Sequence, residues 1–137
     1  MHTITTNNLE VIRMTKGKLP RLPFASFKEK ILGKKYSLTI VFATPAYIQN
    51  LNKQYRQKEY VPNVLAFPIE KNAGELYLSL GTIRKEAQKH DYTYEQFICY
   101  LLIHGLLHLK GYDHGSTMDN EENKFKKFFN VTEKSKN

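Results

Sequence analysis

The segment YEQFICYLLIHGLLHLK, residues 94–110, constrains the fold more than any other part of this 137-residue chain. Thr93 can cap a helix at its start, and Gly111 can end that helix. Between them, apolar side chains occupy nearly the whole circumference of the expected helix. A helix without a continuous polar face must be buried, so we expect the other elements to assemble around residues 94–110.

The rest of the chain interleaves strand and helix patterns. Short β-branched or alternating runs predict strands at 3–8, 36–44, 64–70 (ended by Pro68) and 75–81. Apolar residues spaced three to four apart predict helices at 24–33, 45–56, 82–90, 94–110 and from Ser116 or Thr117, the last with Phe125, Phe128 and Phe129 facing inward. We therefore expect an α+β fold on one small sheet, with residues 1–137 forming a single domain.

Charge favours a polyanionic partner. Lys and Arg number 21 against 13 Asp and Glu, so the net charge is +8. Nucleic acid fits this charge better than a membrane, because no apolar run approaches the roughly 18 residues of a spanning helix and MHTITTNNLE has no apolar leader. Cys99 is the only cysteine, which excludes an internal disulfide and makes a disulfide-linked partner unexpected. We expect a cytoplasmic protein.

Three histidines in HGLLHLKGYDH, residues 104–114, predict a metal site. His104 and His108 are four residues apart and share one helix face, about 6 Å from each other. Gly111 can turn the chain so that His114 approaches the same ion. Three imidazoles with an open fourth position are typical of catalytic zinc, whereas Asp113 could close the site as a fourth ligand or orient a ring nitrogen.

The same spacing occurs in metzincin proteases, which carry a glutamate directly after the first histidine. Here that position is Gly105, so the base that takes the proton from water in those proteases is missing. Gly105 instead permits another backbone to pack closely on the helix. A peptidase or small-molecule hydrolase would have to find its base elsewhere, for instance at Asp113 or Glu75.

The histidine segment resembles the H-G-x-L-H-L-x-G-Y-D-H signature of the YbeY family of bacterial metal-dependent endoribonucleases and ribosomal RNA maturation factors. LNKQYRQKEYVPNVLAFP, residues 51–68, resembles that family's L-N-x-x-Y-R-x-K segment and the V-L-S-F-P strand after it. GEL at 74–76, Met118 and Glu122 also fit, and the resemblance covers about residues 36–129. The chain departs from the pattern at Pro62, Ala66 and Glu75, where Thr, Ser and Asp are usual.

The resemblance implies a mixed sheet flanked by helices, with one Zn²⁺ on His104, His108 and His114. It also implies single-stranded RNA as substrate, in maturation of the 16S ribosomal RNA end and in ribosome quality control, with small-subunit proteins as possible partners. Arg56 corresponds to an arginine associated with activity, and a guanidinium suits the charge that develops during attack on a phosphodiester. Three imidazoles would accept Ni²⁺, Cu²⁺ or Co²⁺ as well.

Further RNA contacts are open at this stage. Lys53, Lys58 and Arg84 are candidates for a basic groove, and Tyr55, Tyr60 and Tyr77 for base stacking, although each of these tyrosines is more simply explained by packing. The nucleophile is either water or the 2′-hydroxyl of the RNA. A non-enzymatic assembly factor with a structural metal is the remaining alternative.

Overall fold

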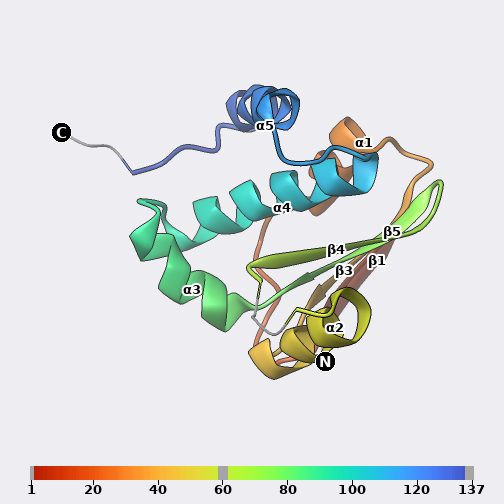
Figure 1. Cartoon of the computed structure of the whole chain (residues 1–137), viewed down its shortest axis with the longest axis vertical. Helices are drawn as coiled ribbons and strands as arrows, with labels where there is room; N and C mark the ends of the chain where they lie inside the picture. The colour runs from red at the N-terminus through yellow and green to blue at the C-terminus, as the bar shows by residue number, and fades with distance from the viewer. Residues whose placement is uncertain (1, 59–61, 135–137) are drawn as a thin grey trace.

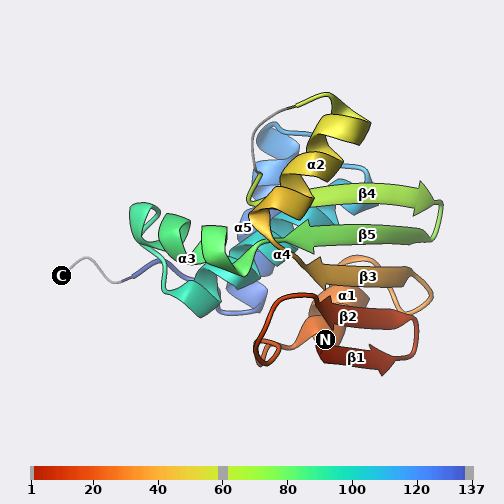
Figure 2. The same ribbon diagram turned by 90° about the horizontal axis from the view of Figure 1, so that it is seen from below.

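The computed structural model describes residues 2–58 and 62–134. Five strands form one mixed sheet in the order β1-β2-β3-β5-β4 (Figures 1 and 2). The outer pairs β1/β2 and β5/β4 are antiparallel, and β2/β3 and β3/β5 are parallel. The α+β expectation with a single mixed sheet is confirmed. The strands are β1 (His2–Thr6), β2 (Leu9–Arg13), β3 (Ser37–Phe42), β4 (Val64–Glu70) and β5 (Ala73–Leu78).

The five helices are α1 (Phe24–Ile31), α2 (Pro45–Arg56), α3 (Leu80–Lys89), α4 (Tyr94–Lys110) and α5 (Ser116–Phe128). Figure 1 shows α4 and α1 above the sheet, α5 above α4, and α2 below the sheet. Three helices begin where a hydroxyl side chain accepts a bond from a backbone N–H: Thr44 from Tyr47, Ser79 from Thr82, and Thr93 from Gln96.

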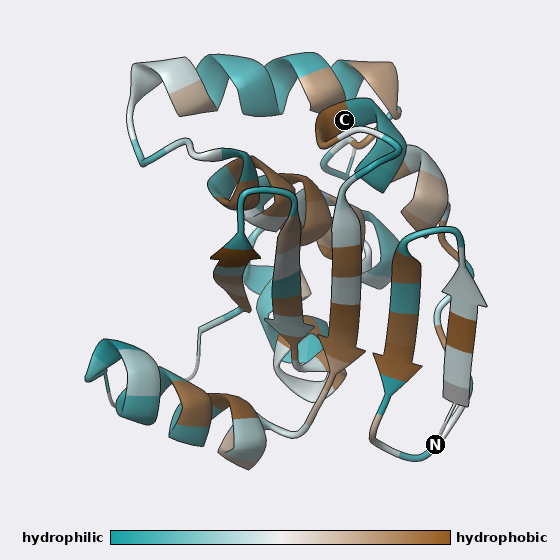
Figure 3. Cartoon of the chain, turned by 90° about the vertical axis from the view of Figure 1, so that its right-hand side faces the viewer, coloured by the Kyte–Doolittle hydropathy of each residue, from teal (hydrophilic) through white to brown (hydrophobic). Residues whose placement is uncertain are grey.

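Helix α4 is the centre of the main core, as its sequence predicts. Ten of its 17 residues are buried, and it packs against β4, β5, α1, α3 and α5. Figure 3 shows hydrophobic residues along α4 and the strands, whereas α5 on the outside is largely hydrophilic. A smaller cluster of Val41, Ala43, Ile48 and Leu65 lies between α2 and the other face of the sheet.

Four details differ from the sequence-based expectations. Strand β2 had not been predicted; it forms because its backbone pairs with β1 and β3 while Leu9 and Val11 are buried in the main core. Strand β4 continues past Pro68, which an edge strand tolerates and which lies at a register shift. Phe125 faces inward as predicted and Phe129 is half-buried, but Phe128 is 58% exposed, so that prediction was wrong. The close neighbours of Gly105 are the side chains of Leu76 and Val64, not a backbone.

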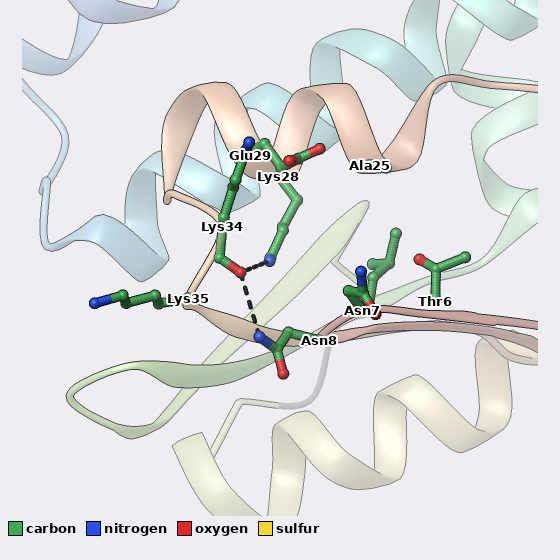
Figure 4. A pocket seen from close by; sticks show the side chains of 9 residues that line it. Thr6, Asn7, Asn8, Ala25, Lys28, Glu29, Lys34 and Lys35 are labelled. Carbon is green, nitrogen blue, oxygen red and sulfur yellow. Dashed lines mark hydrogen bonds between the residues drawn. The ribbon is translucent and has the colours of Figure 1, made fainter.

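A cavity of about 740 Å³ lies between α1 and the β1–β2 turn (Figure 4). At this cavity the buried Lys28 ammonium donates to the Lys34 carbonyl at 2.6 Å, and the Asn8 amide donates to the same oxygen at 3.3 Å. Burial lowers the pKa of Lys28. These bonds fasten the segment after α1 to the hairpin.

Two glycine substitutions test how closely α4 packs on the sheet. A Cβ on Gly105 would lie 2.8 Å from Leu76 Cδ2 and 3.0 Å from Val64 Cγ2. Overpacking of this kind costs about 1–3 kcal/mol, which exceeds the helix-propensity gain of at most ~1 kcal/mol from replacing glycine with alanine. Gly105→Ala should therefore lower the free energy of unfolding measured by chemical denaturation.

The matched control is Gly81→Ala in α3, where an added Cβ meets nothing within 4 Å. This variant should unfold at equal or higher denaturant concentration than the parent. Equal stabilisation by both substitutions would contradict the packing of α4 described here.

Candidate metal centre

The end of α4 brings three histidines together from one helix and the loop that follows it. His104 and His108 lie on adjacent turns of α4, and Gly111 takes a φ of +112°, which ends the helix. The Tyr112 N–H donates to the Leu107 carbonyl, and the Gly111 N–H donates to the His108 carbonyl. These two bonds form a Schellman motif, and the chain then reverses so that His114 faces the helix.

The imidazoles are close enough to share one ion. The Nε2 atoms of His104 and His108 are 3.1 Å apart, and one ring nitrogen from each of the three histidines lies within 4.8 Å of the other two. Tetrahedral coordination with Zn–N distances of about 2.0–2.1 Å places ligand nitrogens roughly 3.3 Å apart. The α4 pair is already near this separation, so the three histidines can hold a metal ion.

The second nitrogen of each α4 imidazole is held by another group. His104 Nδ1 contacts Oε2 of Glu122, a buried residue of α5. His108 Nδ1 donates to the Tyr112 carbonyl at 3.0 Å. Because Nδ1 is occupied in both rings, Nε2 is the atom directed to the ion.

The electrostatics of the cluster favour neutral imidazole at His108. Burial lowers the pKa of His108, and the neighbouring His104 lowers it further. A neutral ring keeps the lone pair that a metal ion requires. The surroundings of His108 therefore favour the neutral form of the ring, which is the form that binds a metal ion.

From the sequence, Asp113 is a candidate fourth ligand or the carboxylate that orients a ring nitrogen. In the described part of the chain, Glu122 makes that contact, and Asp113 is an exposed residue at the edge of the pocket. Glu122 had been noted only as part of the family pattern of the closing helix. Spacing along the sequence could not connect residues 104 and 122, because their contact depends on how α5 packs on α4.

A pocket of about 430 Å³ opens over the histidines and is lined by residues from four parts of the chain. Arg56 reaches it from the end of α2, and β4 contributes one wall. Two positions that depart from the family pattern, Pro62 and Ala66, also line it. The full lining is Arg56, Pro62, Val64, Ala66, Pro68, His104, His108, Gly111, Tyr112, Asp113 and His114.

The other predicted RNA-contact residues do not line this pocket in the described structure. Lys53 lines a separate hollow on α2, and Lys58 is exposed just after that helix. Arg84 lies on α3, where its guanidinium carbon is 4.0 Å from the centre of the Tyr94 ring. Tyr60 lies outside the described residues.

Glu75, the other candidate base, lies on the opposite face of the sheet from the histidines. Its neighbours Gly74 and Leu76 are buried on the α4 side, and Glu75 accepts a hydrogen bond from the Tyr77 hydroxyl at 3.0 Å on the other side. A peptidase mechanism with Glu75 as base is therefore incompatible with this geometry. Asp113 is the one carboxylate among the described residues that line the pocket.

Comparisons with known proteins agree on the family. The family model described as Endoribonuclease YbeY matches residues 6–134. Curated relatives with that name include a Ureaplasma parvum protein, 31% identical over 83% of this chain and 79% of its own length. Another relative, from Phytoplasma mali, is 36% identical over 61% of this chain and 58% of its own length. A third, from Mesoplasma florum, is 30% identical over 74% of this chain and 66% of its own length.

Among solved structures, the solution structure of TM1509 from Thermotoga maritima superposes with a TM-score of 0.60. The two sequences are 26% identical, and the match covers 85% of each chain. These three curated matches cover 61% to 83% of this chain and 58% to 79% of the relatives' own lengths. On the family model and these relatives together, the chain belongs to the YbeY family.

Proposed function

We propose that this chain is a metal-dependent endoribonuclease that cleaves single-stranded RNA. The observation that carries the proposal is the shared pocket: Arg56 from α2 and three histidines from α4 and its following loop line one cavity. Arg56 and the histidines are far apart in the sequence. Packing of the core does not require their polar side chains to line the same pocket. The relatives named Endoribonuclease YbeY and the net charge of +8 support RNA as the substrate.

The donor set fits Zn²⁺, one ion per chain, on His104, His108 and His114. A bound Zn²⁺ would supply Lewis-acid chemistry and make hydroxide available near neutral pH. Ni²⁺, Cu²⁺ and Co²⁺ fit three imidazoles as well.

The residues in and around the pocket have three further roles in the proposed reaction. Arg56 can pair with a phosphodiester and stabilise the extra negative charge that develops when the phosphorus is attacked. Asp113, which lines the same pocket, would accept the proton of the nucleophile, whether that is water or the RNA 2′-hydroxyl. Glu122 and the Tyr112 carbonyl fix the ring orientations of His104 and His108.

At the cellular level we propose maturation of the 16S ribosomal RNA end and ribosome quality control in the cytoplasm, with small-subunit proteins nearby. Residues 1–137 would act as one catalytic domain. The family and the basic charge support this role. None of the helices in the described residues is long and apolar enough to cross a membrane.

Metal analysis tests the ligand assignment. His108→Ala should lose the approximately one equivalent of metal carried by the parent protein, because two remaining imidazoles hold an ion weakly. His90→Ala is the control, since His90 is an exposed residue that stacks on Phe97, pairs with Glu86 and is not one of the three converging histidines. Unchanged metal content in His108→Ala would show that the ion binds elsewhere.

Substitution of Arg56 tests the shared pocket. Arg56→Ala should keep its metal but cleave single-stranded RNA roughly 10²–10³-fold more slowly, because the charge that develops on the phosphate loses its partner. Arg21→Ala removes an equally exposed arginine from the loop before α1 and should cleave at the parent rate. If both variants cleave alike, Arg56 has no part in the reaction.

Glu122→Gln tests how the His104 ring is held. The amide keeps the size of the side chain but removes its charge, so metal affinity should fall about 10–100-fold in competition with a chelator. Glu86→Gln, which alters a surface carboxylate paired with Lys89, is the control. Parent-like affinity in Glu122→Gln would mean that the carboxylate is dispensable for holding the ring.

A further inference from the structure

Strand β4 separates the metal pocket from a second surface. It is an edge strand (Figure 2), and strand geometry directs its side chains alternately to the two faces of the sheet. Val64, Ala66 and Pro68 line the metal pocket, whereas Leu65 and Phe67 belong to the cluster under α2. An extended ligand that leaves the metal pocket over this edge therefore reaches the α2 side of the sheet after crossing a single strand.

Four aromatic rings form a continuous series on that side, which we call the aromatic surface: Tyr47 and Tyr55 of α2, Phe67 of β4 and Tyr77 of β5. Ring centres are 5.8 Å apart for Tyr55 and Phe67, 5.8 Å for Phe67 and Tyr77, and 6.2 Å for Tyr47 and Tyr77. The series thus runs from the end of α2 across β4 and β5.

Two of the four rings, those of Tyr47 and Tyr55, are more exposed than a packing role requires, whereas Phe67 and Tyr77 are half-buried. Tyr55 is 68% exposed and Tyr47 is 41% exposed, although both carry large apolar rings. Beneath them, Ile48 and Leu65 are completely buried and already fill the contact between α2 and the sheet. Tyr55 therefore adds little to the core, and its ring presents apolar area to solvent.

Positive charge accompanies these rings. Lys53 and Arg56 flank Tyr55 in the last turn of α2, and Lys58 follows. Helix α2 contains no acidic residue, and the nearby carboxylate of Glu75 accepts the Tyr77 hydroxyl bond. Arg56 directly follows Tyr55 in the sequence and lines the metal pocket. The last turn of α2 therefore contributes one residue to the aromatic surface and the next residue to the metal pocket.

We propose that unpaired RNA bases stack on the aromatic surface while the attached backbone crosses the edge of β4 into the metal pocket. This inference rests on the proposed ribonuclease function and adds the place where the substrate is recognised. Aromatic side chains bind bases of any sequence through their flat faces, with about 1–3 kcal/mol per base. Bases within a duplex are stacked on each other, so the surface selects single strands without reading their sequence.

Steady-state cleavage of a defined single-stranded RNA tests this proposal. Tyr55→Ala should raise KM about 5- to 150-fold with kcat unchanged, because stacking away from the reacting phosphate contributes equally to substrate and transition-state binding. Tyr55→Phe keeps the ring and should restore KM to near the parent value. Phe67→Leu, which keeps an apolar side chain but removes the neighbouring ring, should raise KM in the same direction.

Phe128→Ala is the matched control. Phe128 is 58% exposed like Tyr55, but it lies on α5 and contacts Phe129 and Lys30. Its removal should leave KM and kcat at the parent values. A parent-like KM in both Tyr55→Ala and Phe67→Leu would overturn the aromatic surface as an RNA site.

The same experiment keeps the two proposals distinct. Cleavage by the parent protein with unaltered KM in the ring variants overturns only the aromatic surface. Absence of cleavage by the metal-loaded parent overturns the ribonuclease function and, with it, the inference that depends on that function.

Discussion

Burial of α4 is the constraint on which the rest of the structure depends. Its apolar circumference is covered by β4 and β5 on one side and by α1, α3 and α5 on the others. Besides the exposed Lys110 at its last position, the half-buried His104 and His108 are the polar residues in the C-terminal half of α4. Burying the helix therefore fixes the position of two imidazoles, and Gly111 returns the third to them.

The packing around α4 also supplies the groups that surround the imidazoles. Because α5 covers α4, Glu122 reaches the Nδ1 atom of His104 without being exposed to solvent. Because β4 lies against α4, its alternate side chains form one wall of the metal pocket and the remaining ones face α2. One edge strand thus joins the centre where chemistry is proposed to the surface where bases are proposed to stack.

Local signals in the sequence predicted those features that depend on neighbouring residues. Thr44 and Pro45 predicted the start of α2, and Thr93 and Gly111 predicted both ends of α4, because caps and helix stops act within one turn. Strand β2 was missed because its five residues become a strand by pairing with β3, about 30 residues later in the chain.

The contact between Glu122 and His104 and the exposure of Phe128 were missed for the same reason: each depends on the angle at which α5 packs. The three histidines could be grouped from spacing alone, whereas their convergence with Arg56 needed the fold.

We propose that the histidines and Arg56 form one centre that cleaves RNA. The most direct measurement is cleavage of a defined single-stranded RNA by the parent protein and by His114→Ala, purified in parallel. His114 is exposed in the loop after α4, so its removal leaves the core intact. The parent protein should cleave the RNA, and His114→Ala should cleave it at least ~100-fold more slowly, because the ion loses a ligand. Equal cleavage by both proteins would contradict a catalytic role of the histidines.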